Sequence, residues 1–416
     1  MSNTITKWLR WECYEMKETE DRQRYLTNIG EKLRIDVQEV FSNGRVENKI
    51  IKQKILDYYK ASEEDWGDWK WQIAHQVRDC DLLRILFHTD SDFISSTRLV
   101  GEKYPFAIAP YYISLLQEPL SEDPLARMCL PNIKEIEDTS GELDPMHEGE
   151  MQPVTCVTRR YPDRLILNVT NQCGSYCRFC QRKRNISFTA TIADEEQIQK
   201  GIEYIRNHSE IRDVLITGGD PLTLEDDQLE GIIKQVREIP HVEIIRLGTR
   251  MPVYIPERIT EKLCKMLSKY HPIYINVHIN HPSEISEKTR RALGRLSDSG
   301  IPLGNQMVLL SGVNNDCSTV LALNRELLRT RVRPYYIFHP KSVQGTMHFQ
   351  CPLAKGLEIM EFLRGRLSGL GIPTYVINSK GGMGKVPILP NYVITRDEGK
   401  IALRTWENKC VKMDID

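Results

Sequence analysis

The sequence lacks any apolar run approaching the roughly 20 residues that a membrane-spanning helix needs, and its formal net charge is only −1. The N-terminal segment MSNTITKWLRWECYEMKETEDR has no hydrophobic stretch like that of a secretory signal. A near-neutral chain also lacks the excess of basic residues that is typical of nucleic-acid-binding proteins. We therefore expect neither a membrane nor a nucleic acid as a partner.

The composition indicates neither a disulfide-stapled nor a disordered protein. The 11 cysteines are an odd number scattered over 416 residues, which is typical of reduced cysteines in the cytoplasm. The hydrophobic share of 40% and the charged share of 27% are ordinary for a folded globular protein. This length predicts one large domain with appendages, or two to three units.

The pattern of apolar residues divides the chain into four parts. Residues 1–115 are charged and predict helices, among them one at 20–37 and one at 50–61. Residues 116–159 form a connector whose second half is acidic, and residues 160–340 alternate short β-rich runs with amphipathic helical stretches. Strands that alternate with helices predict parallel βαβ units, and hence an α/β fold with an open or closed barrel or a doubly wound sheet. The six predicted strands are 165–169, 213–217, 242–247, 273–277, 304–310 and 333–338, and the helices between them are 195–207, 226–238, 256–270, 284–299 and 317–330.

The C-terminal part, residues 341–416, predicts a different arrangement. A helix at 354–370 leads to a short strand at 374–377. Two further strands, 392–395 and 400–405, flank Asp397-Glu398-Gly399 and predict a β-hairpin. This part also carries a glycine-rich segment, residues 379–387, considered below.

Unusual polar residues follow the predicted strands of the 160–340 part. In parallel α/β folds the active site lies at the carboxyl ends of the strands. The residues at or just beyond these ends are Cys173, Gly218-Gly219-Asp220, Thr249-Arg250, Asn280-His281, Asn305-Gln306, His339 and Lys341. We expect the active site where they meet.

Three cysteines lie close together in the segment Cys173-Gly-Ser-Tyr-Cys177-Arg-Phe-Cys180. A structural zinc site needs four ligands, and no fourth Cys or His has suitable spacing. An electron-transfer [4Fe–4S] cluster likewise uses four thiolates. Three thiolates leave one iron open for a substrate, although a non-catalytic iron–sulfur redox or binding protein remains an alternative.

The CxxxCxxC spacing resembles that of the radical S-adenosylmethionine (SAM) superfamily. The resemblance implies a partial (β/α)6 barrel with an N-terminal helical region and a C-terminal extension. It also implies a [4Fe–4S] cluster on the three cysteines that cleaves SAM reductively, with electrons from a donor such as flavodoxin or ferredoxin. Residues 217–221 resemble the glycine-rich motif of the superfamily, so the implied SAM contacts are Gly218, Gly219, Asp220 and Gln306.

The segment 379–387, Ser-Lys-Gly-Gly-Met-Gly-Lys-Val-Pro, is not a phosphate loop, because it lacks the first glycine and the Ser or Thr after the lysine. A glycine-rich loop that ends in Lys385 suits a Schiff base to pyridoxal 5′-phosphate (PLP), although its residue types alone favour an ordinary surface turn. From about residue 65 to 405 the chain resembles the 2,3-aminomutases. The segments that carry this resemblance are 65–71, 160–164, 173–180, 217–221, 280–282, 302–306, 333–336 and 381–392.

The resemblance assigns roles to several residues. Lys385 would carry PLP, and Arg160, Tyr161 and Arg164 would contact its ring and phosphate. Arg182 would pair with the α-carboxylate of an amino-acid substrate. Met383 departs from the family pattern, because it interrupts the glycine run.

Two positions bear on the substrate. The lysine enzymes of this family hold the distal ammonium of lysine with two aspartates, and Lys341 and Asn378 occupy the matching positions here. A cation and an amide call for a distal carboxylate instead. We therefore expect the conversion of L-glutamate to β-glutamate, with lysine as the alternative substrate and a radical SAM enzyme without PLP as the alternative class.

Two cysteines outside the triplet bear on zinc binding. The lysine enzyme carries a cysteine-rich tail that helps to bind zinc, whereas here only Cys410 lies beyond the loop and Cys317 lies near another ligand position. We expect no zinc site. We also expect a homo-oligomer.

Overall fold

The computed structural model describes residues 19–40, 45–187, 189 and 193–415. Its centre is a nine-stranded sheet whose strands follow one another in chain order. The seven strands β2 to β8 are parallel, while β1 and β9 run antiparallel at the two edges. The strands are β1 Val157–Arg159, β2 Arg164–Thr170, β3 Asp213–Gly218, β4 Ile244–Thr249, β5 Ile273–Val277, β6 Leu303–Val308, β7 Val332–Phe338, β8 Thr374–Asn378 and β9 Lys385–Pro387.

The sheet is open, since β1 and β9 each pair with a single neighbour. The α/β fold with a mostly parallel sheet is thereby confirmed, and the six predicted strands correspond to β2 through β7. The third of them lies two residues later than predicted. It continues to Thr249 because Gly248 and Thr249 pair with Asn276 and Val277 of β5.

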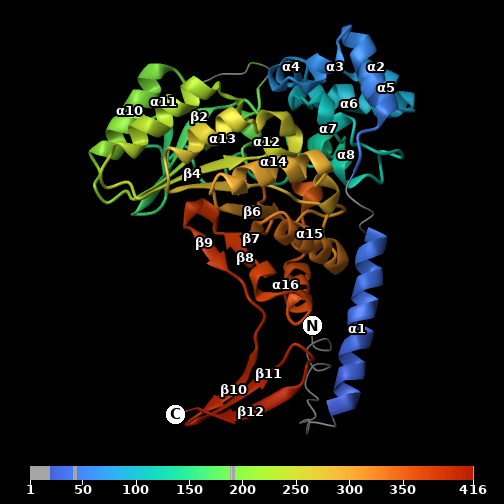
Figure 1. Ribbon diagram of the computed structural model, residues 1–416, viewed down its shortest axis with the longest axis vertical. Coiled ribbons are helices and arrows are strands. Elements are labelled where there is room, and N and C mark those ends of the chain that lie inside the picture. The colour runs from blue at the N-terminus through green and yellow to red at the C-terminus, as the bar shows by residue number, and fades with distance from the viewer. Residues whose placement is uncertain (1–18, 41–44, 188, 190–192, 416) are drawn as a thin grey trace.

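Amphipathic helices cover the outer face of this sheet (Figure 1). In α10, Ile198, Ile202 and Ile205 are buried, whereas Glu196 and Lys200 are exposed. Each such apolar side chain contributes roughly 1.5–3 kcal/mol when it leaves water, so the helices are held against the strands. These helices are α10 Glu195–Arg206, α11 Asp226–Arg237, α13 Glu261–Ser268, α14 Glu287–Asp298, α15 Cys317–Arg329 and α16 Leu353–Leu363.

Three of these helices are shorter than predicted. Helices α13 and α14 begin at the N-caps Thr260 and Ser286, because short 3-10 turns that start with proline come first. Helix α16 ends at Leu363, since Gly365 has φ of +75° and a Cβ there would lie 2.2 Å from the Trp406 ring. The short elements of this part are η2 Lys183–Asn185, η3 Pro221–Thr223, α12 Met251–Tyr254, η4 Pro256–Arg258, η5 Pro282–Glu284, η6 Met347–Phe349, η7 Gly369–Gly371 and η8 Lys380–Gly382.

The N-terminal region is helical, as predicted. Helix α1 packs against α15, extends away from the main body (Figure 1), and pairs Arg22 with Glu407 at 3.3 Å. The next helices pack on the α/β part of the chain, where the Tyr112 hydroxyl donates to Glu284 at 2.9 Å. The helices are α1 Thr19–Val40, α2 Lys49–Tyr59, α3 Glu63–Gly67, α4 Trp69–Ala74, α5 Cys80–Leu86, α6 Ser91–Lys103, α7 Pro110–Ile113, α8 Pro124–Cys129 and α9 Lys134–Glu137.

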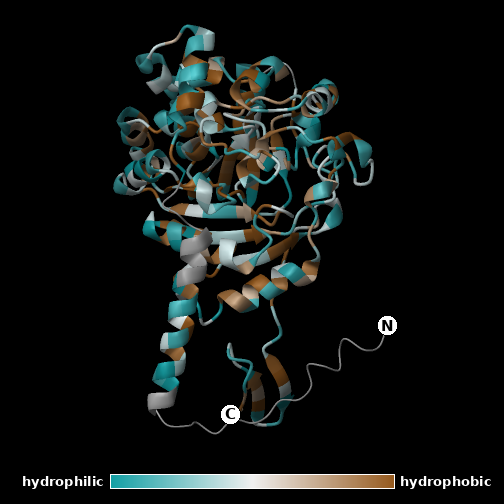
Figure 2. Cartoon of the chain, turned by 90° about the vertical axis from the view of Figure 1, so that its right-hand side faces the viewer, coloured by the Kyte–Doolittle hydropathy of each residue, from teal (hydrophilic) through white to brown (hydrophobic). Residues whose placement is uncertain are grey.

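The C-terminal region forms a small antiparallel sheet of β10 Val393–Asp397, β11 Lys400–Arg404 and β12 Cys410–Asp414. The predicted hairpin is present, and β12 adds a third strand that the sequence analysis missed. Figure 2 shows apolar segments on this sheet, where Val411 and Met413 are exposed. None of the helices in the described ranges is long and apolar enough to span a bilayer. The N-terminal segment used above to exclude a signal lies largely outside the described residues, and the four domain boundaries stay predictions.

Candidate active site

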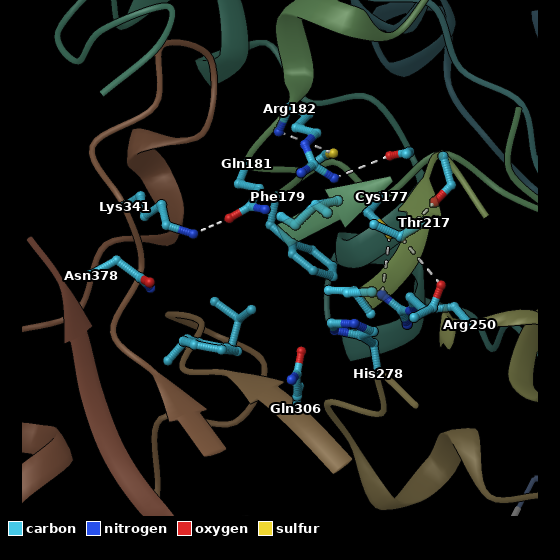
Figure 3. A pocket seen from close by; sticks show the side chains of 18 of the residues that line it. Cys177, Phe179, Gln181, Arg182, Thr217, Arg250, His278, Gln306, Lys341 and Asn378 are labelled. Atoms are coloured by element: carbon cyan, nitrogen blue, oxygen red, sulfur yellow. Dashed lines mark hydrogen bonds between the residues drawn. The ribbon is translucent and has the colours of Figure 1, made fainter. Parts of the chain in front are cut away.

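A cavity of about 310 Å³ lies at the carboxyl ends of the parallel strands. Figure 3 shows side chains from the cysteine-bearing loop, from β6 and from the C-terminal part pointing into it. Every residue assigned a role in the sequence analysis lines this one cavity. These residues are Arg160, Tyr161, Arg164, Cys173, Cys177, Cys180, Arg182, Gly218, Gly219, Asp220, Gln306, Lys341, Asn378 and Lys385.

The three cysteines lie on the loop between β2 and α10. The Cys177 Sγ lies 3.1 Å from the Tyr254 hydroxyl and accepts a hydrogen bond of 3.3 Å from Arg250. The Cys180 Sγ accepts from the backbone N–H of Arg182 at 3.4 Å. Burial raises the pKa of Cys173 and of Cys180. Hydrogen-bond donors around buried sulfur fit an iron–sulfur cluster.

Among the residues that the structure describes, no group of three or more His, Cys, Asp or Glu side chains surrounds a single ion position. Cys173, Cys177 and Cys180 come from one loop and all line the same cavity. Three thiol donors beside an open cavity fit a [4Fe–4S] cluster with one open iron. The expectation of no zinc at Cys317 or Cys410 stays a prediction.

Two glycines hold the cysteine loop close to β3. Gly218 has φ of +126°, and a Cβ there would lie 2.4 Å from the carbonyl oxygen of Thr170. A Cβ on Gly219 would lie 2.2 Å from the carbonyl oxygen of Gln172. Both positions require glycine because the backbone leading to Cys173 passes directly over them. The sequence predicted only a contact with SAM for Gly218 and Gly219.

The carboxylate of Asp220 stabilises the turn after β3 by accepting hydrogen bonds. It accepts from the Thr249 hydroxyl at 2.8 Å and from the backbone N–H of Arg250 at 2.7 Å. Burial raises the pKa of Asp220, although these hydrogen bonds oppose the shift. The residue thereby connects the ends of β3 and β4 at the cavity, and its predicted contact with SAM stays a prediction.

Lys385 lies at the rim of the cavity. Its residue is exposed, but its ammonium lies 5.6 Å from the centre of the Tyr161 ring and 5.9 Å from that of Tyr336. Burial of the ammonium, and then the charges of Arg246 and Arg164, lower the pKa of Lys385 to about 8. A lysine with a lowered pKa is available as a neutral nucleophile near neutral pH.

The surroundings of Lys385 fit the phosphate and ring of PLP. The Tyr161 hydroxyl accepts from the backbone N–H of Lys385 at 2.9 Å, and the Arg164 guanidinium stacks 3.8 Å from the centre of the Tyr161 ring. The Nε of Arg160 is buried without a hydrogen-bond partner among the described residues. A buried donor of this kind has a partner to gain from a bound phosphate oxygen.

The glycine-rich loop before Lys385 requires left-handed backbone. Gly381, Gly382 and Gly384 have φ of +67°, +70° and +105°, and a Cβ on Gly382 would lie 2.4 Å from the Met151 side chain. Met383 between them has φ of −66° and is 83% exposed. The departure at Met383 is therefore compatible with the loop, because neither space nor backbone demands a glycine there.

The structure also places a residue that the sequence analysis did not single out. Glu148, from the acidic connector, is buried and accepts from Arg182 Nε at 2.9 Å and from Arg160 at 3.0 Å. It also contacts Arg184 at 3.3 Å. Burial raises the pKa of Glu148, but the arginines outweigh that effect and lower it to about 2. Glu148 is therefore the shared counter-ion of Arg160, which is predicted to contact PLP, and of Arg182, which is predicted to bind the substrate α-carboxylate.

We expect Glu148→Gln to lower the free energy of unfolding by about 3–5 kcal/mol, because it leaves buried arginines without their counter-ion. The pKa of this carboxyl is depressed, so its contribution to stability is present above its unfolded value of 4.5 and is lost as the pH falls toward about 2. Denaturant titration at neutral pH measures the loss. The matched control is Glu150→Gln on the same segment, where the side chain is exposed. Equal stability of both variants would contradict this role.

Lys341 and Asn378 both face the cavity (Figure 3). The Lys341 ammonium donates to the amide oxygen of Gln181. Burial lowers the pKa of Lys341 to about 7; Glu148 opposes the shift, and nearby cations add to it. The amide nitrogen of Asn378 is buried without a hydrogen-bond partner among the described residues. Both groups can donate hydrogen bonds to a ligand.

Cationic side chains dominate the cavity wall. The acidic lining residues are Glu148 and Asp220, and both are already engaged, as described above. The charge of the lining therefore favours anionic ligands. The cationic lining residues are Arg160, Arg164, Arg182, Arg246, Arg250, Lys341 and Lys385.

Two more lining residues escaped the functional assignment. Arg250 was noted only as the end of a strand, yet it is buried, contacts Cys177 and pairs with Glu284. His278 lines the cavity, and burial lowers its pKa to about 4. Asn280, predicted at the polar end of this strand, also lines the cavity and accepts from Val308 N–H at 2.9 Å, whereas His281 caps a 3-10 turn. The position of His278 directly after β5 was the available signal.

Known proteins resemble the chain along most of its length. The family model of the radical SAM superfamily matches residues 167–322, and that described as lysine-2,3-aminomutase matches residues 360–412. A glutamate 2,3-aminomutase from Clostridioides difficile is 50% identical over 87% of this chain and 86% of its own. L-lysine 2,3-aminomutases from Acetoanaerobium sticklandii and Methanococcus maripaludis are 44% and 43% identical, over 88% and 86% of this chain and 88% and 85% of their own.

The fold, the cysteine triplet and these similarities define the chain as a radical SAM enzyme. Within that class, it belongs to the 2,3-aminomutase family, whose substrates are amino acids. Membership implies a [4Fe–4S] cluster and SAM, and PLP is typical of the family. The identities of 50% and 44% do not separate glutamate from lysine as the substrate.

Proposed function

We propose that this protein moves the amino group of L-glutamate from C2 to C3 and so produces β-glutamate. The observation that carries the proposal is the pair Lys341 and Asn378 on one wall of the cavity. A half-buried lysine with an amide as its hydrogen-bond partner, beside an amide nitrogen without a partner, supports the binding of a distal carboxylate. The glutamate 2,3-aminomutase relative is consistent with this proposal.

The charge of the cavity argues against lysine. A distal ammonium needs carboxylates, because a buried cation without a counter-ion is strongly unfavourable. The two lining carboxylates, Glu148 and Asp220, are engaged by arginines and by the turn after β3. The distal ammonium of lysine, at the place assigned to the distal carboxylate, would instead be repelled by Lys341.

The roles of the other lining residues follow from their positions. We assign Cys173, Cys177 and Cys180 to the cluster, and Gly218, Gly219, Asp220 and Gln306 to the surroundings of SAM. Lys385, Arg160, Tyr161 and Arg164 would hold PLP, and Arg182 the substrate α-carboxylate. When bound, the cluster with SAM supplies the radical and PLP supplies the conjugated system. The protein's own residues orient the substrate and exclude water.

The proposal includes the expected setting of the enzyme. A one-electron donor such as flavodoxin or ferredoxin would reduce the cluster in the cytoplasm. The expected homo-oligomer stays a prediction, which the exposed Val411 and Met413 of the C-terminal sheet support, since exposed apolar groups favour association.

Anaerobic incubation tests the proposal. The reconstituted protein with PLP, SAM and a reductant is given glutamate, lysine or aspartate, and the β-isomers are separated by chromatography. We expect β-glutamate, with lysine disfavoured by at least about 30-fold, because an uncompensated buried charge costs roughly 2–5 kcal/mol. Production of β-lysine without β-glutamate would overturn the substrate assignment. Undiminished turnover by Lys385→Ala would overturn the proposed role of PLP bound to Lys385.

A further inference from the structure

We propose that Gln181 is a third residue that selects the substrate, and that it acts with Lys341 on the distal carboxylate. This inference rests on the proposed function. Gln181 lines the cavity, and its amide oxygen accepts a hydrogen bond from the Lys341 ammonium (Figure 3). The two residues are 160 positions apart in the chain, so only the fold brings them together.

The chemistry of an amide explains why glutamine suits this place. Its oxygen accepts a hydrogen bond from the Lys341 ammonium and orients that group without neutralising its charge. A carboxylate here would form an ion pair with Lys341 and occupy the place of the substrate's own carboxylate. The amide NH2 of Gln181 is a further donor that can reach a carboxylate already held by Lys341. Gln181 therefore leaves the cation available for an anionic ligand.

The position of Gln181 in the sequence adds a second argument. It directly follows Cys180 and directly precedes Arg182. The Arg182 guanidinium donates to Glu148 and, at 3.3 Å, to the carbonyl oxygen of Gly218, whereas the Gln181 side chain contacts Lys341. Consecutive residues of the cysteine-bearing loop thus face the two places assigned to the two carboxylates of glutamate. The distance between the place for the α-carboxylate and the place for the distal carboxylate determines how long an accepted dicarboxylate can be.

The test uses two variants of nearly unchanged size, Gln181→Glu and Gln181→Met. For Gln181→Glu we expect kcat/KM for glutamate to fall by at least about 100-fold, because a fixed carboxylate competes with the substrate for Lys341. Selectivity should move toward glutamine, whose distal amide carries no charge, by about tenfold or more. For Gln181→Met we expect a KM for glutamate raised by about tenfold with kcat nearly unchanged, as for the loss of a hydrogen bond to a charged group.

Binding is measured separately from turnover. The change in PLP absorbance on adding glutamate without SAM gives the dissociation constant. Iron content and the cluster spectrum report whether each variant is intact. Gln199→Glu and Gln199→Met on the exposed face of α10 are matched controls that should leave all values unchanged.

The outcomes separate the two proposals. Wild-type turnover of glutamate together with unchanged KM and unchanged selectivity in both Gln181 variants overturns the role of Gln181 alone. Equal losses for glutamate and glutamine in an intact Gln181→Glu variant also overturn it, because a merely structural residue would not discriminate between the two substrates. A wild-type protein that does not isomerise glutamate overturns the proposed function and this inference together.

Discussion

Replacing Cys173, Cys177 or Cys180 singly by alanine is expected to abolish the iron–sulfur cluster and all turnover. Each cysteine is expected to bind a separate iron of the cluster, so none can substitute for another. All three cysteines line the cavity, with the Cys177 sulfur beside Arg250 and Tyr254, and no other cysteine lines it in the described part of the chain. The expected effect is therefore complete rather than partial.

Iron content and the charge-transfer absorbance after anaerobic reconstitution measure this effect. The matched controls are Cys351→Ala and Cys410→Ala, which alter buried cysteines away from the cavity lining. We expect both controls to retain the iron and the activity, although the loss of a buried thiol lowers stability modestly. A requirement for Cys351 or Cys410 equal to that for Cys177 would contradict the three-ligand assignment.

Changing Lys341→Asp together with Asn378→Asp is expected to abolish the proposed isomerisation of glutamate. The double variant replaces a cation and a neutral donor with two carboxylates at the wall assigned to the substrate's distal carboxylate. Loss of the pair and repulsion between carboxylates cost roughly 2–5 kcal/mol, which corresponds to about 30- to several-thousand-fold in kcat/KM. Lysine should become a better substrate relative to glutamate, although its longer side chain must still fit.

Formation of β-glutamate and β-lysine by wild type and double variant under identical anaerobic conditions measures the change. A matched control with the same change in charge is Lys234→Asp with Asn207→Asp, where both side chains are exposed. We expect this control to behave as wild type. If the double variant turned over glutamate as wild type does, Lys341 and Asn378 would not be the cause of the substrate choice.

Local patterns in the sequence were sufficient for the main parts of the fold. Alternation of β-rich runs with amphipathic stretches predicted β2 through β7, because each element buries its own apolar face. The cysteine triplet needs only eight consecutive residues, Cys173 to Cys180, so it could be read without a structure. The glycine loop before Lys385 was identified for the same reason. Prolines and the left-handed Gly365 moved the helix boundaries in ways that periodicity does not encode.

Only the tertiary structure decided how charges are paired around the cavity. Nothing local to the acidic connector distinguishes Glu148 from its neighbours, yet the fold brings it to Arg160 and Arg182. Gln181 meets Lys341 across 160 residues for the same reason. The sequence by itself determined which residue types carry the chemistry, since ligand spacing and loop composition are local. The fold determined which of them share counter-ions and hydrogen bonds, because such contacts depend on distances in space that separation along the chain does not specify.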